Sequence, residues 1–169
     1  MMRTGVAWFI LAALMLHSTG CGYRLTSHGG LSGRKVAIPV FANKSLRPNL
    51  DSCLTSRLVS VFAAETGGHV VPSGQADLEL SGAILSYRTA ASAYSASDVE
   101  VMYRATLAAE ATLRDLKSGT VVWKGSVLAH QEYPGNSDLA LQVNAEDAAK
   151  NELCRKLADD ILRQSGNSF

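Results

Sequence analysis

The chain has 169 residues, of which 16 are Lys or Arg and 15 are Asp or Glu, so its formal net charge is +1. Hydrophobic residues make up 47% of it, enough for one domain with a real core. A nearly neutral chain argues against general nucleic-acid binding, because that function needs a net basic surface.

The N-terminal segment has the pattern of an export signal. Arg3 is the only charged residue before a continuous apolar block of eleven residues, 6–16. The block is shorter than the roughly 20 apolar residues that span a bilayer, but its length is typical of a signal-peptide core. Small residues follow at 18–20, and the block has no polar face as a buried helix would. We therefore expect residues 1–20 to be a cleaved signal peptide.

Cys21 follows this segment directly. A cysteine at a new N-terminus can be acylated, and two or more acyl chains anchor a protein durably. The stretch Ser-Thr-Gly-Cys resembles the lipobox of bacterial lipoproteins, with Ser18 in place of the usual leucine. Gly22 stands where aspartate would resemble an inner-membrane retention signal. The resemblance implies a lipid anchor on Cys21, carrying diacylglycerol and palmitate, and a protein tethered to the outer membrane.

The mature chain would retain 149 residues, with 15 basic and 15 acidic side chains. Residues 21–33 are rich in Gly and Ser, which is typical of a flexible tether. We expect a single domain over residues 34–165. No second apolar stretch approaches the length of a membrane span.

The first elements are a strand and a helix. Alternating Val36, Ile38 and Val40 predict a strand, and Pro39 places it at a sheet edge because proline has no N–H. Residues 43–49 are expected to turn. A helix follows, capped by Asn49 and ended by Gly67 and Gly68. Its apolar stripe consists of Leu50, Cys53, Leu54, Leu58, Val61 and Phe62.

The middle of the chain predicts strands. Residues 69–73 suggest a short strand, and residues 76–88 alternate as a half-buried strand should. Residues 89–98 contain mostly Ala and Ser, so we expect a mobile loop. Residues 102–114 and 120–133 predict a long antiparallel hairpin around the turn at 115–119, with Val121, Trp123 and Val127 sharing one face of the returning strand.

A second amphipathic helix closes the domain. Asn144 is the expected N-cap, with Asp147 three residues later, and the apolar stripe is Ala149, Leu153, Leu157 and Ile161. The order of elements predicts an α+β fold. We expect a two-layer sandwich in which two amphipathic helices cover one face of a four- or five-stranded, mainly antiparallel sheet.

Catalytic and metal-binding patterns are missing from the sequence. His28, His69 and His130 are isolated from one another and have no partner ligands at metal-binding spacing. Asp77 and Glu79 share the polar face of a strand and are expected to be solvated. The glycines form no phosphate-binding loop. We therefore expect no cofactor, no metal and no enzymatic activity.

Five segments together resemble the LptE family of lipopolysaccharide-assembly lipoproteins. They are "CGYRL", "IPVFANKS", "LDSCLTSRL", "ADLELSGAI" and "DVEVMYRATLAAEATLRD", in the family's order through most of the mature chain. The resemblance implies a small sheet with two helices packed on it. It also implies a lipoprotein that plugs and helps fold a large outer-membrane β-barrel, LptD, and assists lipopolysaccharide insertion.

Two surfaces would suit this role. A plug needs a polar exterior with few charges because barrel lumens are polar, and the outward strand positions supply Thr106, Glu110, Thr112, Lys124 and Ser126. Lipid A phosphates would need exposed cations. The candidates are Lys150, Arg155 and Arg104, and Lys150 is preferred because its place in the last helix resembles that of a basic residue in the family.

Two alternatives remain open at this point. Cys53 and Cys154 could form a disulfide between the helices, or they could be two buried free thiols, since cysteine packs well as a small hydrophobic residue. Part of the sequence, including the Phe-x-Asn turn, also resembles periplasmic lipoproteins that activate cell-wall synthases or line secretion pores. A lipid-carrying or enzymatic domain would need an apolar cavity or a catalytic cluster, for which the sequence gives no sign.

Overall fold

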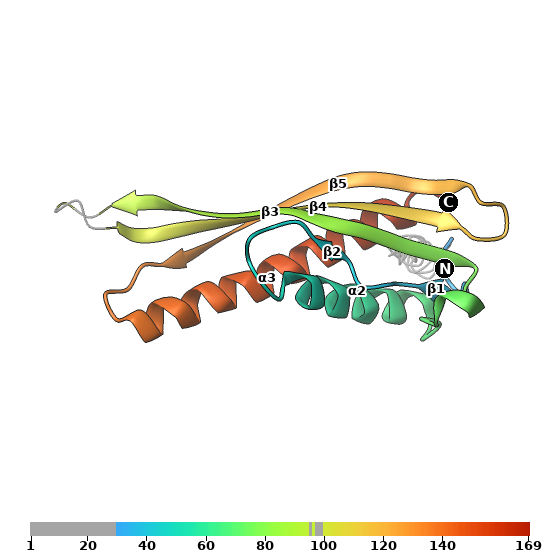
Figure 1. Ribbon diagram of the computed structural model, residues 1–169, viewed down its shortest axis with the longest axis horizontal. Coiled ribbons are helices and arrows are strands. Elements are labelled where there is room, and N and C mark those ends of the chain that lie inside the picture. The colour runs from blue at the N-terminus through green and yellow to red at the C-terminus, as the bar shows by residue number, and fades with distance from the viewer. Residues whose placement is uncertain (1–29, 95, 97–99) are drawn as a thin grey trace, which may run out of the picture.

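The computed structural model describes residues 30–94, 96 and 100–169. The expected signal peptide, Cys21, Gly22, His28 and most of the expected tether lie outside these residues. The described chain forms one sheet with two helices on one of its faces, as Figure 1 shows. The expected α+β sandwich with a mainly antiparallel sheet is therefore confirmed.

Three long strands form the body of the sheet. They are β3 (Leu78–Tyr94), β4 (Glu100–Asp115) and β5 (Val121–Pro134), which run antiparallel in that order. Two short strands, β1 (Val36–Ala37) and β2 (Ala42–Asn43), pair in parallel with β3 at its other edge. The β4–β5 register, with Leu107 opposite Ala129, confirms the expected hairpin.

The N-terminal edge differs from the expectation of one continuous strand over 36–40. The strand stops after Ala37, Pro39 lies between β1 and β2, and Val40 is 70% exposed. Proline has no N–H to donate to the ladder, so the pairing with β3 resumes only after it. The short strand expected over 69–73 is also wrong: Val70 makes a single bridge to Val36, and a 3-10 helix, η1 (Ser73–Gln75), follows.

The loop expected over 89–98 is largely strand. β3 continues to Tyr94, with Thr89 opposite Ala105 and Ala91 opposite Tyr103. Small side chains cannot drive core formation, but backbone hydrogen bonding to a neighbouring strand does not require large side chains. The β3–β4 pair therefore extends beyond α2 at the left of Figure 1. Residues 95 and 97–99 lie outside the described part.

Helix α2 (Leu50–Thr66) begins and ends where the sequence indicates. Its buried side chains include Leu54, Leu58 and Phe62. Asn49 is the N-cap residue, as expected, but it has a left-handed φ of 64° and its side chain makes no cap hydrogen bond. Gly67 ends the helix at φ 72°, a conformation that glycine adopts without steric cost.

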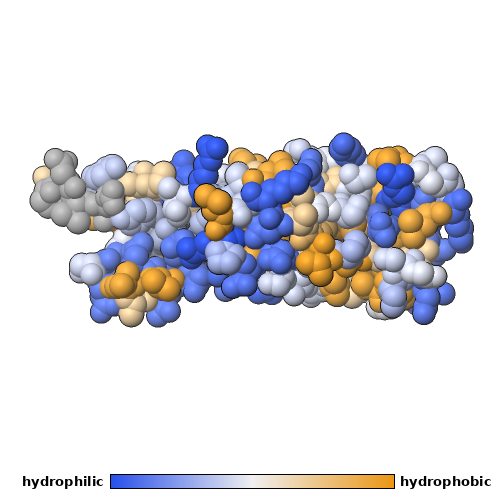
Figure 2. All heavy atoms as spheres, viewed as in Figure 1, coloured by the Kyte–Doolittle hydropathy of each residue, from blue (hydrophilic) through white to orange (hydrophobic). Residues whose placement is uncertain are grey.

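Helix α3 (Leu139–Gly166) starts earlier than expected, and its N-cap is Asp138 rather than Asn144. The Asp138 carboxylate accepts the N–H groups of Ala140 (2.8 Å) and Leu141 (3.2 Å). The first turns carry exposed apolar side chains, visible as a hydrophobic patch at the lower left of Figure 2. Because these residues make no core stripe, hydrophobic periodicity could not reveal them. They are Leu139, Leu141 and Val143.

The core lies between the sheet and the two helices. The expected stripe of α3 is buried, and so is that of α2 except for Cys53 and Val61, which are half-buried. Leu31 is also fully buried, so the flexible tether expected over 21–33 does not extend to its last residues. Val121 is 48% exposed instead of facing the core with Trp123 and Val127, because the β4–β5 register shifts beside it. Among the described residues, no helix is both long and apolar enough to cross a bilayer.

Candidate interaction surfaces

The sheet face that points away from the helices is polar. On β4, alternate residues from Ala105 to Leu113 are buried against the helices, so the residues between them point the other way. We call this surface the open face. On the two C-terminal strands it consists of Arg104, Thr106, Ala108, Glu110, Thr112, Lys124, Ser126, Leu128, His130 and Glu132. All five positions expected to contact a barrel lie on it.

Charges on the open face are largely neutralised by neighbours. The Arg104 guanidinium lies 2.7 Å from the Glu132 carboxylate, and the Lys44 ammonium lies 3.1 Å from that of Glu110. These side chains are substantially exposed, so each pair adds little to stability. Of the charged side chains named on the open face, only Lys124 has no ion-pair partner among the described residues, and the rest of this face carries mainly hydroxyl and small side chains.

Lys150 lies in a half-buried cluster between α3 and the sheet. Its ammonium is 2.8 Å from an Asp147 carboxylate oxygen, and the Arg47 guanidinium reaches the same oxygen at 3.8 Å. Arg47 also pairs with Glu146 at 3.2 Å, and the Tyr87 hydroxyl donates to Glu146 at 3.1 Å. We call these five residues the Asp147 cluster.

Neighbouring charges and burial shift the pKa values of two groups in this cluster, Asp147 and Tyr87. The hydrogen bond from Lys150 holds the pKa of Asp147 below its usual range. Burial, together with the negative charge of Glu146, raises the pKa of Tyr87 well above its usual value. Asp147 is therefore ionised and Tyr87 neutral at physiological pH. The cluster therefore brings two cations, Lys150 and Arg47, together with two carboxylates, Asp147 and Glu146.

The other two candidate cations lie elsewhere. Arg155 is on an exposed part of α3 and pairs with Glu152 and with Asp159, the latter at 2.9 Å. Its hydrogen bonds to Glu152 lower the pKa of that carboxyl group. Arg104 is on the open face. The structure thus does not bring the three candidates together.

Sequence reasoning missed Arg47 and Glu146, which complete the Asp147 cluster. Arg47 precedes α2, whereas Glu146 lies in α3, so no local pattern connects them. The guanidinium of Arg47 also stacks over the Tyr87 ring, 5.7 Å from its centroid. Only the packing of α3 beside the 43–49 turn and β3 makes these contacts visible.

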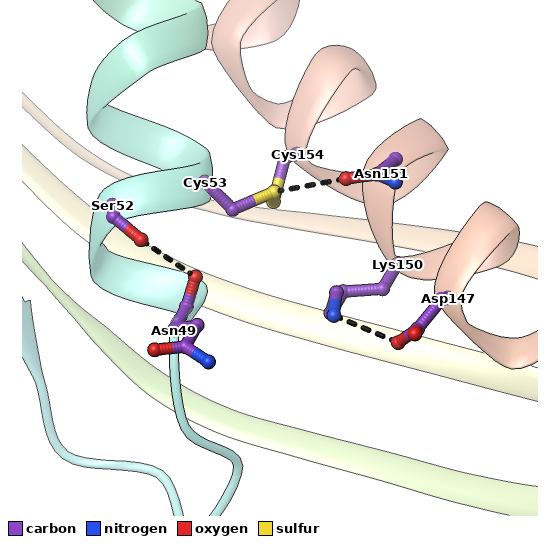
Figure 3. The surroundings of a disulfide bond; sticks show 7 residues. All are labelled: Asn49, Ser52, Cys53, Asp147, Lys150, Asn151 and Cys154. Atoms are coloured by element: carbon purple, nitrogen blue, oxygen red, sulfur yellow. Dashed lines mark hydrogen bonds and ion pairs between the residues drawn. A yellow bond between two sulfur atoms is a disulfide. The ribbon is translucent and has the colours of Figure 1, made fainter. Parts of the chain in front are cut away.

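A disulfide joins the two helices in the structure. Figure 3 shows Cys53 of α2 bonded to Cys154 of α3, next to the Asp147 cluster. Their Cα atoms are 6.1 Å apart, within the range that a disulfide spans. Cys154 is fully buried and Cys53 is half-buried. The bond ties together two segments that are 101 residues apart in the chain.

Within the part of the chain that the structure describes, no group of three His, Cys, Asp or Glu residues could hold a metal ion. His69 and His130 are both exposed and lie in different parts of the fold. Asp77 is ion-paired with Lys117 at 2.7 Å, which lowers the pKa of its carboxyl group.

The sequence matches the protein-family model described as "LptE: Lipopolysaccharide-assembly" over residues 33–165. This range includes every described helix and strand except the last residue of α3. No curated protein matches the chain.

Solved structures share the fold at low sequence identity. An uncharacterized lipoprotein B from Nitrosomonas europaea has a TM-score of 0.57 at 14% identity, with 80% of this chain and 84% of that chain covered. A minor lipoprotein from Acinetobacter baumannii has a TM-score of 0.55 at 14% identity, with coverages of 80% and 92%. PelC from Paraburkholderia phytofirmans, a dodecamer, has a TM-score of 0.55 at 18% identity, with coverages of 79% and 89%.

Proposed function

Because the chain belongs to the LptE family of lipopolysaccharide assembly, we propose that it is a non-catalytic subunit of the outer-membrane translocon, plugging the LptD β-barrel, assisting barrel folding and helping lipopolysaccharide enter the outer leaflet. In this proposal acyl chains on Cys21 hold the protein at the outer membrane. The folded domain lies in the barrel lumen and faces the periplasm.

The main support for the proposed barrel contact is the polar character of the open face. It presents Thr106, Thr112 and Ser126 between charge pairs that are already neutralised. Such a surface matches a polar lumen, because hydroxyl groups can exchange water for lumen side chains without leaving a charge unpaired. The far ends of β3 and β4 extend this surface beyond α2.

The Asp147 cluster is the first candidate for a lipid A phosphate. Lys150 and Arg47 point at one carboxylate oxygen, so a phosphate could displace Asp147 and be held by both cations. Arg155 and Arg104 are paired with carboxylates as well, but in the ion pairs of the described residues neither shares its carboxylate with a second cation. We therefore place the primary contact at Lys150, with Arg155 and Arg104 as outer contacts.

Site-specific photo-crosslinking in cells tests the barrel proposal. A photoreactive residue at Thr106 or Ser126 should cross-link to LptD, whereas one at Arg57, an exposed residue on α2, serves as the matched control. Depletion of the protein should also lower the amounts of mature barrel and surface lipopolysaccharide. Unchanged barrel and lipopolysaccharide levels, with a cell-wall synthase cross-linked instead, would show that the proposal is wrong.

A further inference from the structure

A groove lies between the end of β5 and the first half of α3, near the turn that joins these two elements (Figure 1). Its main hollow has a volume of about 360 Å³, which is at the lower end of the range of small-molecule sites. Most of the lining is apolar, and the α3 side is formed largely by alanines, whose short side chains leave the space open. The apolar lining residues are Tyr133, Pro134, Ala145, Ala148 and Ala149.

The apolar surface continues from the hollow toward the start of α3. Leu141 is one turn before Ala145 on the same face of the helix, since residues three or four apart are neighbours, and its side chain is 54% exposed. The Tyr133 ring stacks on that of Tyr103 with the centroids 5.6 Å apart, so this wall of the hollow is held in place. A continuous exposed apolar surface in a hollow is typical of a binding site.

Lys156 stands at the other end of the hollow. Its ammonium donates to the side-chain oxygen of Gln131, which lines the hollow, at 2.8 Å and to the His130 carbonyl at 3.1 Å. Both acceptors are neutral, and Lys156 has no ion-pair partner among the residues that the structure describes. A carboxylate offered by a ligand would make a stronger, charge-assisted hydrogen bond with the same ammonium.

The carboxylates beside the hollow already have cationic partners. Glu132 lies 2.7 Å from the Arg104 guanidinium, and Glu152 accepts from Nε of Arg155 at 2.9 Å. Beyond Lys156 the groove is lined by the charged residues Asp159, Asp160 and Arg163. The groove is therefore apolar on one side of Lys156 only, and the ammonium at this boundary is not neutralised by a carboxylate.

We propose that this groove is a binding site for a long-chain fatty acid, with the alkyl chain in the apolar hollow and the carboxylate on Lys156. One apolar hollow with one cation at its end matches a ligand with one alkyl chain and one terminal anion. A peptide fits less well, because the His130 carbonyl is already bonded to Lys156 and the alanines offer no side-chain hydrogen bonds to a backbone. None of these residues belongs to the Asp147 cluster, so the proposal is independent of the translocon role.

The length and charge of the ligand test the proposal. Calorimetry should measure dodecanoate binding to the purified full-length protein below the concentration at which the ligand forms micelles. Affinity should rise from octanoate to dodecanoate by roughly fourfold for each methylene that enters the hollow. Dodecanol has the same chain without the anion and should bind roughly tenfold or more weakly. Equal binding of dodecanol and dodecanoate, or no binding of dodecanoate, would overturn the proposal.

Substitutions locate the site. Lys156→Gln should lower dodecanoate affinity roughly tenfold or more and leave dodecanol affinity unchanged. The matched control is Lys124→Gln, which removes an exposed cation that has no ion-pair partner among the described residues, and it should change neither affinity. Ala148→Phe fills the hollow from an exposed helix position and should weaken both ligands. Melting temperatures check that each variant is folded.

Two results of these measurements would overturn the site. One is dodecanoate binding that neither Lys156→Gln nor Ala148→Phe changes, since the ligand would then lie elsewhere, including on residues 1–29, which all variants share. The other is a groove that binds lipid A or phosphatidylglycerol vesicles in an Ala148-dependent way but does not bind dodecanoate, since its occupant would then be a lipid with several chains.

Discussion

At the residue scale, the Asp147 cluster gives the sharpest expectation for lipopolysaccharide. Lys150→Asp removes a cation and adds an anion beside Asp147, so lipopolysaccharide binding should fall roughly tenfold or more. Asp147→Asn removes the competing carboxylate and should strengthen binding instead. Binding of the purified protein to labelled lipopolysaccharide measures both effects.

The control for this prediction is Arg57→Asp, which reverses an exposed charge on α2 that is not a member of the Asp147 cluster. Its binding should stay close to that of the wild type. If all three variants bind equally, the cluster is not a phosphate site. A single melting measurement checks that each variant is folded, which matters because the Lys150 side chain is only 17% exposed and its replacement also removes the ion pair with Asp147.

The lowered pKa of Asp115 predicts how the free energy of unfolding depends on pH. Its carboxylate accepts the N–H groups of Lys117 and Ser118, both at 2.9 Å, and pairs with Arg34, which together hold its pKa below the usual value. A lowered folded-state pKa contributes stability above the unfolded pKa, and this contribution is lost as the pH falls through the folded value. Asp115→Asn should therefore reduce the free energy of unfolding at neutral pH and have a smaller effect near about pH 3. Urea titrations at the two pH values measure it, and an equal loss at both would contradict it.

At the scale of elements, the disulfide between α2 and α3 should make a large contribution to the free energy of unfolding. Closing a loop across 101 residues stabilises the fold by about 4–5 kcal/mol in the chain-entropy model. The double substitution Cys53→Ala and Cys154→Ala should lower the free energy of unfolding by an amount of this order. Thiol labelling of the unreduced, denatured wild type should find neither cysteine reactive.

Reductant supplies the control for the disulfide. It should destabilise the wild-type protein toward the level of the double variant and leave that variant unchanged. Full thiol labelling without reduction would show that Cys53 and Cys154 are free thiols.

The start of α3 gives a second prediction at this scale. Asp138 accepts two N–H groups of the first turn, so Asp138→Ala should destabilise the fold by about 1 kcal/mol. Asn144→Ala lies inside the helix and should change stability by only a few tenths of a kcal/mol. Chemical denaturation measures the loss of stability in each of the two variants. A larger loss for Asn144→Ala than for Asp138→Ala would indicate that the helix starts at Asn144, as expected from the sequence.

For the whole molecule, the acyl anchor proposed on Cys21 would decide where the domain works. Protein extracted from membranes should have an intact mass that begins at Cys21 and includes acyl chains, and it should fractionate with the outer membrane. Cys21→Ser should shift the protein to the soluble periplasmic fraction, because the hydrocarbon chains provide the membrane affinity. An uncut chain that begins at Met1, or a mature Cys21 without acyl mass, would contradict the anchor.

The elements with strong periodicity could be predicted from the sequence. Helices α2 and α3 present apolar residues every three or four positions, and β4 and β5 alternate, so burial of one face was readable without the fold. The family segments also come from the sequence, and the match over residues 33–165 bears them out. The open face follows from the same alternation, since Thr106 and Thr112 lie between buried neighbours.

Features that depend on contacts between distant segments could not be predicted from local patterns and became visible in the folded chain. The residues at 89–94 look like a loop because Ala and Ser bury little, yet β4 supplies the hydrogen bonds that make them a strand. Arg47 joins Glu146 and Asp147 because α3 packs beside the turn before α2. Pairing of Cys53 with Cys154 depends in the same way on the two helices lying side by side. Local patterns encode burial, whereas polar contacts between distant segments depend on how the elements pack together.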